Sequence, residues 1–217
     1  MSLKIILTGA TGFVGEGVLF ECLENTEVKE VLMLNRKHYD LKHPKLKELL
    51  VPDFMKLDSV LEDLVGYDAC FYCAGISSVG LNEKAYTHIT YDTTLHFARE
   101  LLVKNSNMVF TFVTGSHTDS SEKGKVMWAR VKGKTENALG KLGFKKQYNV
   151  RPGFMKPTPG QKNVKSLYKI IGAVFPLLFP KSSSTVQELG LAMIHATLKG
   201  YPNQTLEIKD IKHLARG

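Results

Sequence analysis

The sequence predicts an α/β fold, in which a doubly wound parallel sheet is joined to a small C-terminal lobe. Short apolar runs alternate with segments of helical periodicity up to about residue 150, and this alternation indicates βαβ units. A parallel sheet of this kind is covered by helices on both faces. A stretch rich in proline and glycine, from Arg151 to Gly160, then ends the alternation. The 217 residues are enough for one such domain.

The elements follow one another without an internal repeat or a linker-like change of composition. The apolar runs expected as strands are residues 4–7, 31–34, 49–51, 70–73, 109–113, 148–150 and 205–208. The expected helices are residues 15–24, 59–64, 83–104, 125–142 and 186–198. We expect a single domain over residues 1–217, with its core over about 1–153 and a smaller lobe over about 154–217 that completes a cleft.

Composition and charge restrict the partners. Hydrophobic residues make up 43% of the chain and charged residues 23%, which are ordinary globular values. The formal net charge is +8, but the cations are scattered rather than gathered in a basic block, so no nucleic-acid partner is expected. Three cysteines and the lack of a leader before KIILTGA indicate the cytoplasm. No apolar run reaches the roughly 18–20 residues of a transmembrane helix. For the oligomeric state, a homodimer is kept as a candidate.

The strongest motif is TGATGFVG, residues 8–15, which follows the first strand and opens the first helix. Glycines at this spacing permit a tight turn, a close approach to a diphosphate, and packing of the helix on the sheet. The free N–H groups at the start of the helix then bind the anion. An ordinary Gly-rich βα loop has the same spacing, but this position favours a Rossmann-like dinucleotide site. Its expected contacts are Thr8, Gly9, Thr11, Gly12, Phe13, Val14 and Gly15.

The second strand ends at Asn35, Arg36 and Lys37. Sites for NAD commonly place a carboxylate here for the ribose 2′-hydroxyl, whereas sites for NADP place an arginine nearby for the 2′-phosphate. This chain has two cations and no acid at that point. We therefore expect NADP as the cofactor, with NAD less favoured and with Arg36 as the main phosphate contact. The alternative is a solvated strand end.

These motifs resemble the short-chain dehydrogenase/reductase superfamily, in its extended and atypical branches, over nearly the whole chain. Together DFMKLD, VKG and RPG are most similar to the Tat-interacting-protein type of atypical member. The resemblance implies that Asp53 and Phe54 lie beside the adenine. It places Cys73-Ala74-Gly75 along the cofactor and Arg151-Pro152-Gly153 near the nicotinamide.

The superfamily's catalytic set is a serine followed by Tyr-x-x-x-Lys on the next helix. The resemblance assigns Ser116 to the serine and Lys132 to the lysine, which binds the nicotinamide ribose. The tyrosine position holds Trp128, whose indole has only an N–H donor and cannot act as the general acid. Trp128 is therefore expected to face the nicotinamide and the substrate. A substitute acid is expected, if at all, from His117, Tyr86, His88 or Tyr91.

Because Trp128 replaces the superfamily's catalytic tyrosine, two functions are considered. The first is an NADPH-dependent oxidoreductase of unknown substrate, which reduces a small molecule or passes hydride to an acceptor such as a flavin or quinone. The second is a non-catalytic NADP(H)-binding redox sensor that reports to a partner.

Three further patterns are weaker evidence for function. Cys70 and Cys73 form a C-x-x-C pattern, but residues three apart on a strand point to opposite faces, so buried core cysteines are expected. The histidines are dispersed, and no metal site is expected. The apolar segment 166–179, SLYKIIGAVFPLLF, is expected to pack in the core or line an apolar pocket, with peripheral membrane contact as the weaker alternative.

Overall fold

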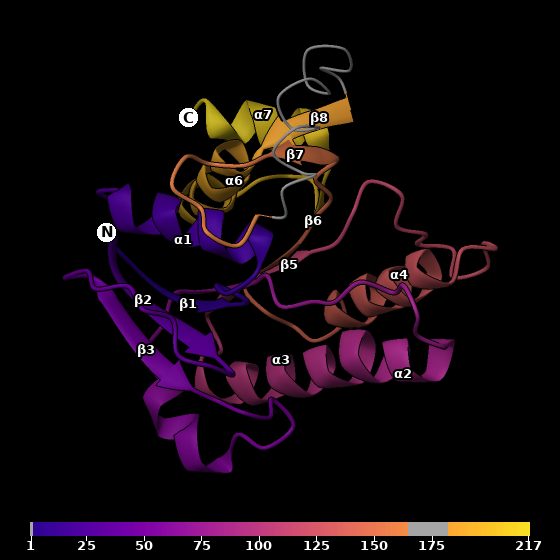
Figure 1. The fold of residues 1–217 in the computed structure, drawn as a ribbon, viewed down its shortest axis with the longest axis horizontal. Coiled ribbons are helices and arrows are strands. Elements are labelled where there is room, and N and C mark those ends of the chain that lie inside the picture. The colour runs from indigo at the N-terminus through magenta and orange to yellow at the C-terminus, as the bar shows by residue number, and fades with distance from the viewer. Residues whose placement is uncertain (1, 165–181) are drawn as a thin grey trace.

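A parallel sheet of seven strands organises the computed structural model, which describes residues 2–164 and 182–217 (Figure 1). The strand order is β3-β2-β1-β4-β5-β6-β9, and every neighbouring pair is parallel. The strands are β1 (Leu3–Thr8), β2 (Val28–Asn35), β3 (Leu46–Leu50), β4 (Ala69–Tyr72), β5 (Val109–Val113), β6 (Lys146–Val150) and β9 (Thr205–Leu206). The order reverses between β1 and β4, which is the position where ligands bind in open α/β sheets.

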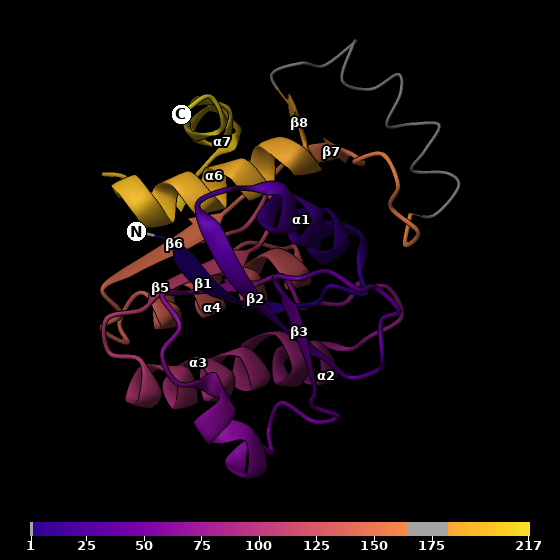
Figure 2. The same cartoon turned by 90° about the vertical axis from the view of Figure 1, so that its left-hand side faces the viewer.

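Helices cover both faces of this sheet (Figures 1 and 2). One face carries α1 (Phe13–Glu24), α6 (Val186–Lys199) and α7 (Ile208–Ala215). The other carries the 3-10 helix η1 (Asp58–Leu64), α2 (Glu83–Thr87), the π-helix η2 (His88–Asp92), α3 (Thr93–Lys104) and α4 (Met127–Leu139). The doubly wound α/β fold expected from the sequence is confirmed.

Two hydrophobic clusters hold these layers together, one on each face of the sheet. On β1, Ile5 and Leu7 belong to the cluster beneath α1 and α6, while Ile6 belongs to the cluster beneath α3. All three are fully buried. Because successive side chains of a strand point to opposite faces, a strand buried on both sides reads as a continuous apolar run. This is why KIIL predicted a central strand.

The C-terminal part contains elements that the apolar pattern did not predict. Two short strands, β7 (Phe154–Lys156) and β8 (Ser183–Thr185), pair in a separate parallel sheet. The strand expected over residues 205–208 ends at Leu206, because a capping box of Glu207 and Asp210 starts α7. The helix α6 begins with another capping box and ends before Gly200, whose φ of 72° suits glycine.

Two other expectations change in detail. The helix expected over residues 83–104 is divided into α2, η2 and α3, and the helix expected over residues 59–64 is a 3-10 helix. The apolar segment 166–179 lies outside the described residues. None of the helices in residues 2–164 and 182–217 has the length and apolar character needed to cross a bilayer.

Candidate functional site

The turn between β1 and α1 is built on close backbone contacts that admit only glycine. Gly9 has a φ of 75°, and a Cβ there would lie 2.6 Å from the backbone of Cys73 and Ala74. A Cβ on Gly15 would lie 2.2 Å from the carbonyl oxygen of Gly9. The Ala74 N–H donates to Thr8 Oγ1 at 3.2 Å, which ties the turn to the end of β4. The turn is therefore a compact cradle at the N-terminus of α1, where a bound anion is favoured.

A cavity of about 430 Å³, here called the Arg36 cavity, opens beside this cradle. It brings together residues that the sequence predicted for one cofactor from four separate segments. These are Gly9, Thr11, Gly12, Asn35, Arg36, Asp53, Phe54, Cys73, Ala74 and Gly75. Phe54 is held by stacking on Phe97, with ring centroids 5.1 Å apart. Lys37 is exposed and does not line this cavity.

Asn35, at the end of β2, lines the Arg36 cavity and carries an unpaired acceptor. Asn35 is buried, and its Nδ2 donates to Glu48 Oε1 at 3.2 Å. Its Oδ1 is buried and has no hydrogen-bond partner within the described residues. Burial alone would raise the pKa of Glu48, yet hydrogen bonds from Tyr39, His38 and Asn35 hold it below its ordinary value. Glu48 therefore stays ionised and fixes the Asn35 amide through Nδ2, while Oδ1 is left without a partner among the described residues.

A second cavity of about 410 Å³, here called the Lys132 cavity, shares Gly12 and residues 73–76 with the first. Lys132 lines it from α4, and its Nζ donates to the carbonyl oxygen of Thr114 at 3.1 Å. Burial lowers the pKa of this amine to about 8, against the opposing effect of the Glu136 carboxylate. An amine with such a pKa is a candidate functional group.

Ser116 and Trp128 do not line the Lys132 cavity. Trp128 is half-buried beside Gly115, where a Cβ would lie 3.8 Å from the indole ring. The hydroxyl groups that line the cavity were mostly not predicted and come from Ser77, Tyr86, Thr90, Thr94 and Thr114. Thr114 directly follows β5, and this position at the end of a central strand could have identified it.

The substitute acids named from the sequence are dispersed. Tyr86 lines the Lys132 cavity, and burial raises its pKa. His88 lines the Arg36 cavity instead. The ring of Tyr91 lies under Lys134, with Nζ 4.5 Å from its centroid, and His117 is exposed. Of these four, Tyr86 is the residue in the Lys132 cavity.

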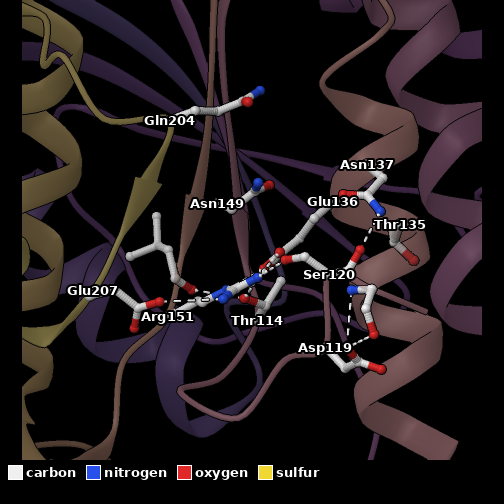
Figure 3. Close-up of polar contacts among 12 residues, drawn as sticks. Thr114, Asp119, Ser120, Thr135, Glu136, Asn137, Asn149, Arg151, Gln204 and Glu207 are labelled. Carbon is white, nitrogen blue, oxygen red and sulfur yellow. Dashed lines mark hydrogen bonds and ion pairs between the residues drawn. The ribbon is translucent and has the colours of Figure 1, made fainter. Parts of the chain in front are cut away.

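The Arg-Pro-Gly segment divides between two places. Gly153 lines a third cavity of about 860 Å³, here called the Lys162 cavity, with Phe13, Met155 and Lys162. A Cβ on Gly153 would lie 2.3 Å from the Ser182 carbonyl oxygen. Arg151 and Pro152 line none of the three cavities. Figure 3 shows that the Arg151 guanidinium lies among protein carboxylates and hydroxyls.

The cysteines are separated by the sheet. Cys70 belongs to the cluster beneath α3, and Cys73 packs against the cluster beneath α1, so the two point to opposite faces as expected. All three thiols are free, and burial raises the pKa of Cys73 to about 12. Within residues 2–164 and 182–217 there is no cluster of three or more His, Cys, Asp or Glu side chains suited to a metal ion.

The sheet order and the glycine cradle define a Rossmann-like α/β protein with a dinucleotide-type loop. Residues 5–120 match the NAD dependent epimerase/dehydratase family, and the chain belongs to this family. A comparison with curated proteins gave no match.

Solved structures with the same fold include short-chain dehydrogenases and sugar epimerases. Bordetella bronchiseptica WbmF in complex with NAD+ is 15% identical, with a TM-score of 0.67 over 99% of this chain and 77% of that one. Helicobacter pylori ADP-L-glycero-D-manno-heptose-6-epimerase is 16% identical, with a TM-score of 0.66 over 91% and 73%. The carbonyl reductase Sniffer of D. melanogaster is 14% identical, with a TM-score of 0.56 over 76% and 86%. At these identities the likeness concerns the fold alone.

Proposed function

We propose that the protein is an NADP(H)-dependent oxidoreductase of the atypical short-chain type, acting on a small molecule in the Lys132 cavity. The observation that carries the proposal is that the glycine cradle and Lys132, whose pKa is lowered by burial, line one cavity. Gly12 and the end of β4 are common to this cavity and the Arg36 cavity. A ligand that extends from Arg36 to Lys132 thus crosses the cradle between them.

The residues on this path fit a nicotinamide dinucleotide. The cradle of Gly9, Gly12 and Gly15 would hold the diphosphate, because Gly9 and Gly15 permit the tight turn and the free N–H groups at the start of α1 favour an anion. Asp53 and Phe54 would hold the adenine end and Lys132 the nicotinamide ribose. When bound, the cofactor supplies or accepts a hydride.

The choice between the two dinucleotides depends on the end of β2. We favour NADP(H), because Arg36 lines the cavity and no carboxylate from β2 does. The unpaired Asn35 Oδ1 is a hydrogen-bond acceptor, which suits a ribose hydroxyl and makes NAD(H) the second candidate. The NAD+ in the WbmF structure is consistent with this second candidate.

The proton in a carbonyl reduction needs a donor other than Trp128. Tyr86 is a phenol in the same cavity as Lys132, and its raised pKa keeps it protonated at neutral pH. It would donate the proton to the substrate oxygen and be reprotonated from solvent. Lys132 would hold the ribose, and the hydroxyls of Thr90 and Thr94 would orient the substrate oxygen.

The second candidate function is an NADP(H)-binding redox sensor without turnover. The observation that favours it is that Ser116 and Trp128, at the family's catalytic positions, lie outside the Lys132 cavity. A sensor needs the cradle and Lys132 but no proton donor.

The two functions are separated by measuring NADPH binding by calorimetry and NADPH consumption with carbonyl, quinone and flavin acceptors. An oxidoreductase binds NADPH and consumes it with one of these acceptors, and Lys132→Met abolishes both. Tight binding without consumption by any acceptor would establish the sensor. Absence of binding by NADPH and NADH alike would reject both functions.

A further inference from the structure

A buried ion pair lies directly behind Lys132 and does not line the Lys132 cavity. We propose that Glu136 and Arg151 are positioning residues, which act through Thr114 to set the placement and the charge of Lys132. The proposal rests on the proposed function, in which Lys132 holds the nicotinamide ribose.

Thr114 is bonded at both of its oxygen atoms, and this makes it the link. Its carbonyl oxygen accepts the hydrogen bond from Lys132 Nζ at 3.1 Å. Its hydroxyl donates to Glu136 Oε1 at 2.7 Å. Glu136 lies one helical turn after Lys132 on the same face of α4, and its side chain is 1% exposed. Lys132 and Glu136 are therefore joined both along the helix and through Thr114.

Arg151 closes the network from the end of β6 (Figure 3). Its Nε donates to Glu136 Oε1 at 3.0 Å, and its Nη2 bonds Glu136 Oε2 as the second half of a bidentate pair. Its remaining donors reach Ser120 Oγ at 2.6 Å and Glu207 Oε1 at 3.3 Å. Its backbone N–H bonds the Leu206 carbonyl oxygen at 2.9 Å. The guanidinium is thus fixed by three protein residues, Glu136, Ser120 and Glu207, and its bidentate contact is with Glu136.

The Glu136–Arg151 ion pair is the main charged group beside Lys132 and therefore affects its pKa. Burial lowers the pKa of Lys132, and the Glu136 carboxylate raises it by a smaller amount. Tyr86 and Cys73 line the same cavity and are neutral at pH 7, because burial raises the pKa of each. Arg151 lies behind Glu136 and balances its charge.

Several charged groups on the elements that pack against α4 are paired elsewhere. Glu83 of α2 forms an ion pair with Arg130 at 2.8 Å, and His88 and Asp92 of η2 lie 3.5 Å apart. The carboxylate of Asp119 is exposed and accepts bonds from Ser121 and Gly124. Glu136 is consequently the acid that acts on Lys132.

The two halves of the pair should move Lys132 in opposite directions. Glu136→Gln removes a negative charge and leaves Arg151 uncompensated, so the Lys132 pKa falls below 8. Arg151→Gln leaves Glu136 uncompensated, so the Lys132 pKa rises. We expect the pKa of Lys132 to shift by about one unit in each single variant, which corresponds to about 1.4 kcal/mol of changed interaction. The double variant should fall between the two single variants.

The experiment measures the pH dependence with which Lys132 of the full chain reacts with an acylating reagent, by mass spectrometry of its peptide. Glu207→Gln is the matched control, because Glu207 contacts Arg151 at the outer side and its loss leaves the Glu136 pair in place. A role confined to fold stability would leave the titration unchanged or move both single variants the same way, and would overturn the proposal. If a single variant fails to fold, Thr114→Val removes the hydroxyl that bonds Glu136 and keeps the carbonyl that bonds Lys132, and a changed Lys132 titration is expected for it.

Failure of the proposed function gives a different result. If NADPH does not protect Lys132 from acylation while the two variants shift its titration oppositely, the cofactor role is wrong and the positioning role is established. If NADPH protects Lys132 while neither variant shifts the titration, the positioning role is wrong.

Discussion

The carboxylate of Glu16 accepts two hydrogen bonds from Asn163, which lies 147 positions further along the chain. The Asn163 N–H bonds Oε2 at 2.8 Å, and its Nδ2 bonds Oε1 at 3.1 Å. The Lys162 N–H and the Tyr39 hydroxyl complete the set at 3.0 Å and 2.7 Å. Glu16 is fully buried in the first turn of α1. It thereby fastens one wall of the Lys162 cavity to the N-terminal end of α1.

Replacing Glu16 by Gln should loosen this wall. An amide keeps one acceptor oxygen but turns the other into a donor, so at least one part-buried N–H of residues 162–163 loses its partner. Such a loss costs about 1–3 kcal/mol. Urea denaturation should show a free energy of unfolding lower by about 2 kcal/mol, and hydrogen exchange should accelerate at residues 162–164. Glu24→Gln, at an exposed position of the same helix, serves as the control. Equal stability of the two variants would contradict the assigned role.

The main sheet could be predicted because each central strand is buried on both faces and reads as an apolar run. The β7–β8 pair could not, since FMK and SST have three residues each and no apolar period. The eight residues of α7 were missed because Ile208 extends the apolar run of β9, although the capping box at Glu207 was a readable signal. The π-helix η2 was hidden, because one wide turn leaves the helical period of residues 83–104 nearly unchanged.

The candidate site was predictable where backbone geometry dictates residue type. The cradle needs glycine at positions 9 and 15, so spacing alone located it. The direction of a long side chain depends on neighbours that the sequence does not reveal. Arg151 was expected to bind the cofactor, a prediction that stays untested, while its guanidinium contacts Glu136 across the β6–α4 packing. Thr90 and Thr94 line the Lys132 cavity from η2 and α3, and they were missed for the same reason, because the surface on which these helices pack was unknown.

Arg36→Ala should weaken NADPH binding by about 10–100-fold and leave NADH binding nearly unchanged. The reason is that a hydrogen bond to a charged group contributes about 1.5–3 kcal/mol, and only NADPH carries the 2′-phosphate. Fluorescence titration with each nucleotide measures this difference. Lys37→Ala is the matched control, because Lys37 is the neighbouring cation and does not line the Arg36 cavity. NADPH binding that is equal in the Arg36 variant and the wild type would reject Arg36 as the phosphate contact.

Tyr86→Phe should lower kcat for carbonyl acceptors by about 100-fold or more and leave the Kd for NADPH unchanged. The variant keeps the ring in the wall of the cavity and removes the proposed proton donor, and general acid catalysis contributes factors of this size. Tyr91→Phe removes a hydroxyl from a tyrosine outside the cavity and should have no comparable effect. A kcat that is retained in Tyr86→Phe would show that the proton comes from another group or from water.

Lys132→Met should make the protein more stable at neutral pH while abolishing NADPH binding. The amine has a pKa of about 8 in the folded protein, against an ordinary value of 10.5. Protonating a group whose folded pKa is depressed disfavours the folded state, so the destabilisation is fully present below pH 8 and disappears as pH rises to 10.5. After allowance for partial exposure, the variant should gain about 2 kcal/mol in the free energy of unfolding at pH 7.

The measurement is the difference in the free energy of unfolding between variant and wild type from pH 6 to pH 11. The difference should be constant up to about pH 8 and then shrink steadily towards pH 10.5. Lys134→Met is the control, since Lys134 is exposed two positions further along α4. A pH-independent difference would mean that the pKa of Lys132 is not lowered in the folded protein. A gain in stability with loss of binding is expected where a site keeps a buried cation for its ligand.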